Sequence, residues 1–204
     1  MQTTYLDRHP GVKDTFGIIF FLICVLIGTL VINAFIFRSF NVSGRSMQPT
    51  LQDGDRLIVN RLPVTASQLQ NKDYMPERGQ IIVFKNPQYD DIKNAEQYVV
   101  KRVIGFPGER VTLVDGTYKI FNSENPTGFN PDDESNDEPK SPTSGEADVV
   151  VPEKTLFVSG DNRVGQNSLD SRNGESGLGV VPFYDLIGPV GVRIFPFNEI
   201  RTFK

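Results

Sequence analysis

Apolar residues follow two patterns along the chain: one long uninterrupted run near the N-terminus, and many short runs after it. The long run extends from Phe16 to Phe37, 22 residues without a charge. As a helix it would be about 33 Å long, enough to cross a hydrocarbon core of about 30 Å. Apart from Thr29 and Asn33 it has no polar face, unlike the core helix of a soluble protein. The pattern predicts a single transmembrane helix.

A cleaved secretory signal is the competing interpretation of this run. Its apolar region is usually only about 7–15 residues long and follows a short basic start. Here the run is longer and is preceded by a polar segment, so we favour a retained anchor. The chain is then divided into a short polar tail (1–15), an anchor (16–37) and a domain (38–204).

The short apolar runs after the anchor are rich in β-branched residues and are separated by turn signals such as Pro107-Gly108 and Asp115-Gly116. They predict strands at Arg56–Asn60, Gln80–Phe84, Gln97–Ile104, Arg110–Val114, Thr117–Phe121, Val149–Val151, Leu156–Val158 and Leu186–Phe195. At most one short helix is expected, near Ala66–Asn71. The expected fold class is therefore mainly β behind a single helix.

The segment Asn130–Asp148 differs in composition from the rest of the domain. It holds seven acidic residues and one lysine, whereas the whole chain has a net charge of −4. Because it has almost no apolar residue, we expect a solvated, mobile insertion rather than a strand. The acidity is thus local, and nothing basic enough to suggest a nucleic-acid partner is present.

The counts of histidine and cysteine restrict the chemistry of the domain. The 204 residues include one histidine, His9, before the anchor, and one cysteine, Cys24, inside it. The domain therefore has no imidazole and no thiol, and any hydrolytic site there must take its base from lysine or a carboxylate. Charge does not decide the orientation, because two basic residues precede the anchor and two follow it closely, at Arg38 and Arg45.

Two residues are candidates for nucleophilic catalysis. Ser46 lies in a turn between Gly44 and Pro49, which can expose its hydroxyl and a backbone N–H together, although a purely structural turn fits the segment equally well. In Gln97–Ile104 the period of two places Lys101 and Arg102 on opposite faces, so one of them must meet apolar neighbours. A buried lysine loses hydration, which favours the neutral form that can act as a base. On this segment alone, an edge strand with Lys101 reaching water is the preferred alternative.

A third polar cluster follows the apolar run Leu156–Val158. Its two parts are Ser159–Arg163 and Asn167–Arg172, both dense in Gly, Asp, Asn, Ser and Arg. Such a cluster is ordinarily a hydrogen-bonded turn with a surface ion pair. As a functional site, it supplies hydroxyls that could orient a lysine and an Asp–Arg pair that could hold the loop.

Together with the anchor, these segments resemble the bacterial type I signal peptidases, the membrane-anchored serine proteases that remove signal peptides from exported proteins. The similarity follows the same order along the chain and covers its whole ordered length. The matching segments are Ser46–Leu51, Gly54-Asp55, Arg78–Phe84, Lys101–Gly108, Gly160–Arg163 and Asn167–Arg172. Each is weak alone, but several in order behind one span are specific.

The resemblance implies a role for each matching residue. Ser46 would be the nucleophile and Lys101 the general base, in a Ser–Lys dyad without histidine, metal or other cofactor. Ser168 would orient the lysine amine, with Asp161, Asp170 and Arg172 as scaffold, while Met47 and Leu51 would line a shallow pocket for small side chains. The oxyanion hole would be built from backbone N–H groups at Ser46 and Gly44. Phe106 to about Pro152 would form a variable second β region.

The chain departs from the family pattern at several places. Three residues lie between Arg163 and Asn167, two more than in the usual family pattern, and the segment after Arg172 is also longer than usual. Both differences affect the expected placement of Ser168. Gly44 stands where some members have a serine whose hydroxyl helps to stabilise the oxyanion.

The resemblance implies an endopeptidase that cleaves preproteins after small residues at the membrane surface, with its tail cytoplasmic and its domain on the far side of the plasma membrane. Ser46 is eight positions after Arg38, which keeps it within about 29 Å of the membrane end along the chain. The alternative is a membrane-tethered β binding module without catalysis. A repressor-type peptidase would bring a DNA-binding domain, and a sortase would need an exported Cys and His, so neither fits.

Overall fold

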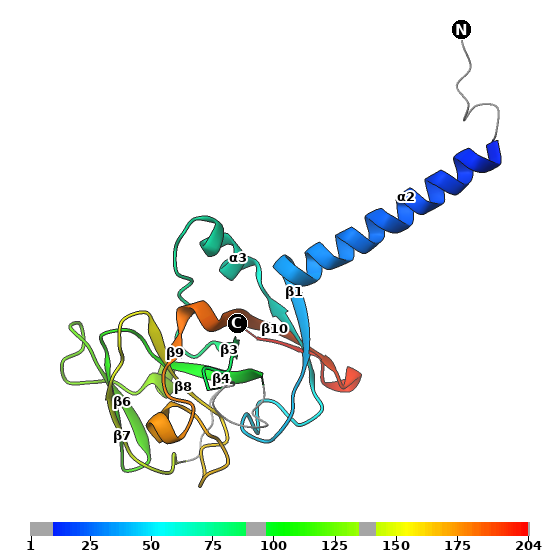
Figure 1. Ribbon diagram of the computed structural model, residues 1–204. Coiled ribbons are helices and arrows are strands. Elements are labelled where there is room, and N and C mark those ends of the chain that lie inside the picture. Colours follow the sequence, from blue (N-terminus) through cyan, green and yellow to red (C-terminus); the bar gives the residue numbers. More distant parts are fainter. Residues whose placement is uncertain (1–9, 89–96, 135–141, 204) are drawn as a thin grey trace.

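The computed structural model describes residues 10–88, 97–134 and 142–203. It shows one long helix that projects from a domain built mostly of antiparallel strands (Figure 1). Helix α2 (Pro10–Val31) continues into a π-helical turn (Ile32–Ile36), and the chain then passes directly into strand β1 (Phe37–Asn41). The segment Asp14–Ile36 is long and apolar enough to cross a membrane, and none of it is buried.

The strands form two sheets. The larger sheet has eight strands in the order β1-β2-β10-β3-β4-β8-β9, with β11 also paired to β10. The smaller sheet has the order β6-β5-β7. The strands after β1 are β2 (Arg56–Asn60), β3 (Ile81–Lys85), β4 (Tyr98–Gly105), β5 (Arg110–Val114), β6 (Thr117–Phe121), β7 (Ala147–Val150), β8 (Thr155–Ser159), β9 (Val181–Pro182), β10 (Leu186–Phe195) and β11 (Arg201–Thr202).

The prediction of a mainly β domain behind one apolar helix is confirmed, and each of the eight predicted runs overlaps a strand. The short helix α3 covers Leu62–Leu69 and so begins four residues before the expected segment. Three short strands were not predicted, β1, β9 and β11. Strands β9 and β11 have only two residues each, which is too short for an alternating pattern. Strand β1 begins at Phe37, the last residue of the apolar run, so the run itself does not indicate that a strand starts there.

The acidic segment is less solvated than its composition predicted. Its last residues, Ala147 and Asp148, belong to β7, where they pair with β5. Thr143 is buried, and Asp132 forms an ion pair with the buried Arg163. Residues 135–141 lie outside the described part of the chain, as does His9.

Three apolar clusters make up the core. One lies between helix α3 and the strands around β3 and β8, and includes Ile82 and Phe84. A second holds Met47, Leu51 and Leu57 beneath the loop that carries Ser46. The third joins the small sheet to the large one through Tyr118 and Phe157, whose ring centroids are 6.0 Å apart. The second cluster fixes the Ser46 loop against the large sheet.

Candidate active site

Ser46 lies on a loop that is tied to the sheet at both ends. The Val42 N–H donates to the carbonyl of Asp55, and the Gly54 N–H donates to the carbonyl of Val42. Asp55 is buried and also accepts hydrogen bonds from the Gln52 N–H at 2.9 Å and from the Arg193 guanidinium at 3.0 Å. A buried Asp–Arg pair thus anchors this loop to strand β10.

Lys101 reaches the same place from strand β4. This strand is central, because it pairs with β3 on one side and with β8 on the other. Lys101 is only 3% exposed, and its Nζ donates to Ser46 Oγ at 2.7 Å. The edge strand with a solvated lysine, which the segment alone favoured, is therefore wrong.

Arg102, the neighbour of Lys101, is buried as well. Its guanidinium forms a bidentate pair with Asp161, with distances of 2.8 Å from Nε to Oδ1 and 2.6 Å from Nη2 to Oδ2. Alternation along β4 sends the two basic side chains to opposite faces, and both faces are covered. The strand therefore presents a lysine to the Ser46 loop and an arginine to the loop that begins at Gly160.

The Gly160–Arg163 loop contacts the backbone of the Ser46 loop. The Asn162 N–H donates to the Ser46 carbonyl at 2.9 Å, and the Asn162 side chain donates to the Arg45 carbonyl at 3.0 Å. Gly160 packs against both Ser46 and Ser168, because a Cβ at this position would overlap with the Ser46 carbonyl oxygen and with Ser168 Oγ. These contacts bring the third polar cluster of the sequence to the Ser46–Lys101 pair.

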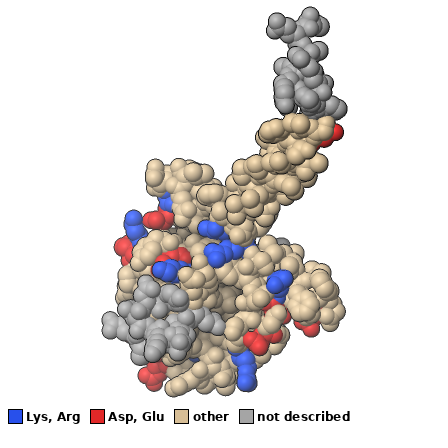
Figure 2. Space-filling model, turned by 45° about the vertical axis from the view of Figure 1, so that its right-hand side comes forward, with Lys and Arg blue, Asp and Glu red and all other residues tan. Residues whose placement is uncertain are grey.

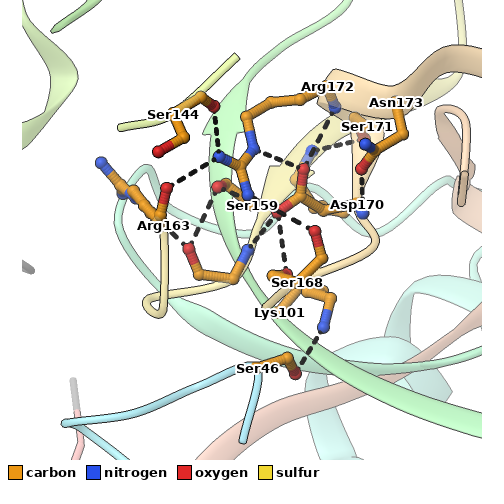
Figure 3. Close-up of polar contacts among 12 residues, drawn as sticks. Ser46, Lys101, Ser144, Ser159, Arg163, Ser168, Asp170, Ser171, Arg172 and Asn173 are labelled. Carbon is orange, nitrogen blue, oxygen red and sulfur yellow. Dashed lines mark hydrogen bonds and ion pairs between the residues drawn. The ribbon is translucent and has the colours of Figure 1, made fainter. Parts of the chain in front are cut away.

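Ser168, Asp170 and Arg172 form one buried network beside Lys101 (Figure 3). Asp170 Oδ2 accepts from Ser168 Oγ, the Gly160 N–H and Arg172 Nη2, each at 2.9 Å. Although burial alone would lower it, the pKa of Arg172 is raised above its ordinary value, chiefly by the hydrogen bond to Asp170. In Figure 3, Ser168 lies between Asp170 and the Ser46–Lys101 pair.

A cleft opens beside Ser46 and Lys101. Its volume is about 80 Å³, and besides these two residues it is lined by Asn41, Ser43 and a set of apolar and aromatic side chains, namely Phe40, Val42, Leu57, Val83, Tyr98, Val99 and Val100. Met47 and Leu51 are not among the lining residues: they are 1% and 0% exposed in the core cluster below the loop. Both side chains therefore anchor the loop, and their place in the substrate pocket stays a prediction.

The backbone at Gly44 also differs from the expectation. Its N–H donates to Asp53 Oδ1 at 2.8 Å, within the turn that closes the Ser46 loop. This N–H is thus directed to a carboxylate rather than to the space in front of Ser46. The oxyanion donor that remains from the sequence prediction is the N–H of Ser46 itself.

Comparisons with known proteins show the family of the chain. The family model of the signal peptidases, peptidase S26, matches residues 13–195. The chain belongs to this signal peptidase family. The family predicted from the sequence is thereby confirmed, and with it the class of enzyme: a membrane-anchored serine endopeptidase of the signal peptidase I type.

Individual signal peptidases are similar over most of their length. Signal peptidase I T of Bacillus subtilis strain 168 is 35% identical over 185 residues, which is 90% of this chain and 86% of that protein. A signal peptidase I of Bacillus licheniformis is 35% identical over 182 residues, 88% of each chain. A crystal structure of a signal peptidase I from Enterococcus faecalis V583 covers 56% of this chain and 96% of that chain, with 29% identity and a TM-score of 0.40.

The sequence singled out the residues that the structure brings together, but it missed several that position them. Gly160 and Asn162 were noted only as part of a polar motif, and their contacts with Ser46 depend on a loop more than one hundred residues away along the chain. The aromatic cleft residues Phe40 and Tyr98 come from an unpredicted strand and from the first residue of β4. The sequence signal for this close approach of two backbone segments was the position of Gly160, in a polar motif directly after an apolar strand.

Proposed function

We propose that this signal peptidase cleaves preproteins by a Ser46–Lys101 dyad. The observation that carries the proposal is the distance of 2.7 Å between Lys101 Nζ and Ser46 Oγ, with the lysine buried. Burial disfavours the charged form of a lysine. The neutral amine accepts the Ser46 proton as the hydroxyl oxygen attacks the scissile carbonyl. When the peptide C–N bond breaks to give the acyl-enzyme, Lys101 passes this proton to the leaving amine, and the neutral lysine then takes a proton from the water that hydrolyses the acyl-enzyme.

The surroundings of the dyad support defined roles for the other residues. The Ser46 N–H stabilises the oxyanion. Ser168 orients the lysine amine, and Asp170 holds Ser168 through the 2.9 Å hydrogen bond between their side chains. Asp161 and Arg172 are scaffold residues, each in a buried ion pair.

The substrate is the region of a preprotein just after its apolar signal segment. An extended segment fits the cleft, with main-chain hydrogen bonds for affinity and small side chains toward the shallow floor beside Val83 and Leu57. The helix before the domain anchors the enzyme in the bilayer, so that Ser46 stays near the membrane surface. In this proposal the N-terminal tail is cytoplasmic and the catalytic domain is extracytoplasmic.

The test uses the full-length protein in detergent with a precursor that carries a signal peptide. Ser46→Ala removes the nucleophile, and we expect unprocessed precursor to persist. Ser123→Ala is the matched control, because Ser123 is an exposed serine in the loop after strand β6 and does not line the cleft; it should cleave at a rate close to that of the wild type. Normal processing by Ser46→Ala would rule out the proposed mechanism.

A further inference from the structure

Two arginines lie at the point where the membrane helix enters the domain. Strands β1 and β2 are antiparallel, with Arg38 opposite Val59 and Phe37 opposite Asn60. The Arg61 N–H continues this ladder by donating to the Ile36 carbonyl at 2.7 Å. Because side chains alternate, Arg38 and Arg61 share one face as diagonal neighbours, a relationship that places Cβ atoms about 7–8 Å apart or less. Figure 2 shows basic side chains gathered at the foot of the uncharged stretch of helix.

Arg38 is held by aromatic rings. Its guanidinium lies 4.6 Å from the centroid of the Tyr98 ring and 5.0 Å from that of Phe40, and Nη1 donates to the Tyr98 hydroxyl at 3.3 Å. Stacking fixes the plane of a guanidinium while its edge carries the N–H donors. Arg38 is therefore oriented before any ligand is bound.

Arg61 has a donor without an acceptor. Its Nε is buried and has no hydrogen-bond partner in the described part of the chain. Its Nη1 reaches the Asn33 carbonyl only at 3.5 Å. The pKa of Arg61 is lowered, first by burial and then by the charge of Arg38. Two positive charges thus face each other, and among the described residues neither forms an ion pair with a carboxylate.

We propose that Arg38 and Arg61 bind the phosphate of an anionic lipid headgroup. Guanidinium groups match phosphate oxygens with paired, charge-assisted hydrogen bonds. The site lies two residues beyond Ile36, the last residue of the helical segment, which is the depth at which headgroups are found. Anionic membrane surfaces also attract basic residues next to a span. The proposal rests on the helix crossing a membrane and is independent of the Ser46–Lys101 assignment.

The site adjoins the catalytic cleft. Phe40 and Tyr98, the two rings that hold Arg38, also line the cleft together with Ser46 and Lys101. A headgroup bound to both arginines would hold this end of the cleft at the membrane surface. Lipid binding would thereby set the height at which a membrane-bound substrate meets the enzyme.

The experiment measures which lipid the full-length protein retains in neutral detergent. Equimolar phosphatidylglycerol and phosphatidylcholine are added, and protein-bound lipid is counted by native mass spectrometry. The wild type should retain phosphatidylglycerol preferentially. Arg61→Gln, which leaves the stacked Arg38 in place, and the double variant R38Q/R61Q should lose this preference by about tenfold or more, as expected when charge-assisted hydrogen bonds are removed.

Arg56→Gln is the matched control. Arg56 is paired with Asn41 at the other end of the same two strands, and its Nε donates to the Asn41 side chain at 3.0 Å. This variant should keep the wild-type preference, and cooperative thermal melting confirms that each variant is folded; if the double variant does not fold, Arg61→Gln alone decides. Equal retention of both lipids by the wild type, or an unchanged preference in Arg61→Gln, would overturn the proposal. Displacement of phosphatidylglycerol by millimolar inorganic phosphate would show a free-phosphate site and overturn the headgroup assignment.

Discussion

Gly160 packs directly against the carbonyl oxygen of Ser46, with no space for a side chain between them. The same glycine meets Ser168 Oγ, and its N–H donates to Asp170. One residue without a Cβ therefore lets three parts of the site approach: the Ser46 loop, the Ser168 loop and the end of strand β8. The separation between the proposed nucleophile and its supporting network is set by this contact.

Gly160→Ala should lower cleavage strongly while the protein stays folded. The added methyl group must displace the Ser46 backbone or Ser168, an overpacking that typically costs about 1–3 kcal/mol of stability. A displacement of about 1 Å can reduce a catalysed rate about 100-fold. Precursor cleavage and thermal melting measure the two effects.

Gly191→Ala is the control for this substitution. A Cβ at Gly191 meets only the Ile58 carbonyl oxygen, at an ordinary contact distance of 3.6 Å. Its cleavage rate should remain near that of the wild type. A Gly160→Ala enzyme that is as fast as Gly191→Ala would show that the close approach at Gly160 does not position the dyad.

Asp132→Asn should destabilise the domain by about 2 kcal/mol, the usual magnitude for a hydrogen bond to a charged group. Asp132 pairs with both terminal nitrogens of the Arg163 guanidinium, which is fully buried and stacks 5.0 Å from the Tyr118 ring centroid. Without the carboxylate, this buried charge loses its partner. Chemical denaturation measures the change in the free energy of unfolding.

The neighbouring substitution Asp133→Asn is the control. It distinguishes the loss of the Asp132–Arg163 ion pair from the removal of one negative charge from the acidic segment. Asp133 is exposed, and among the described residues its side chain accepts a local hydrogen bond from Asn130 at 3.0 Å. It should change stability little. Equal effects of the two substitutions would contradict the view that Asp132 anchors the acidic segment to the loop beside the active site.

The sequence was sufficient to predict the order of elements and the two residues at the centre of the site. Periodicity located the strands, and the absence of imidazole and thiol from the domain left lysine or a carboxylate as the base. Whether Lys101 is buried could not be predicted from its own segment, because its burial depends on the pairing of β4 with β3 on one side and with β8 on the other. These strand pairings are non-local, so the residues of the segment do not indicate them.

The burial of Met47 and Leu51 could not be predicted for a related reason. In the loop Val42–Leu51, alternation does not indicate which apolar side chains face the cleft, and Met47 and Leu51 proved to be the anchors of the loop. The residues that line the cleft come from four strands, β1 to β4, and from the loop itself. Likewise, composition predicted a solvated acidic segment, although a single buried arginine is enough to bind its first part to the domain.

Raising the pH above about 10 should destabilise the domain through Tyr118. Burial, followed by the charge of Asp170, raises the pKa of Tyr118 above its ordinary value of 10.0. The folded state therefore holds this proton more tightly than the unfolded state does, so its contribution to stability is complete below pH 10.0 and is lost as the pH rises toward the raised pKa. Thermal melting of the wild type and of Tyr118→Phe at pH values on both sides of 10.0 measures this loss. The variant should show a smaller alkaline decrease, and an identical decrease would contradict the assignment.

The most direct test of the dyad is the pH dependence of precursor cleavage in the wild type and in Lys101→Met. Lys119→Met is the control for the loss of a positive charge, because Lys119 is exposed on strand β6. The wild-type and Lys119→Met rates should rise with pH, because only the neutral amine of Lys101 can take the Ser46 proton. Lys101→Met should lose about 10²–10⁴-fold in rate at every pH, the contribution typical of a general base, and should lack the rise. Cleavage by Lys101→Met at the wild-type rate, with the same pH profile, would contradict the account.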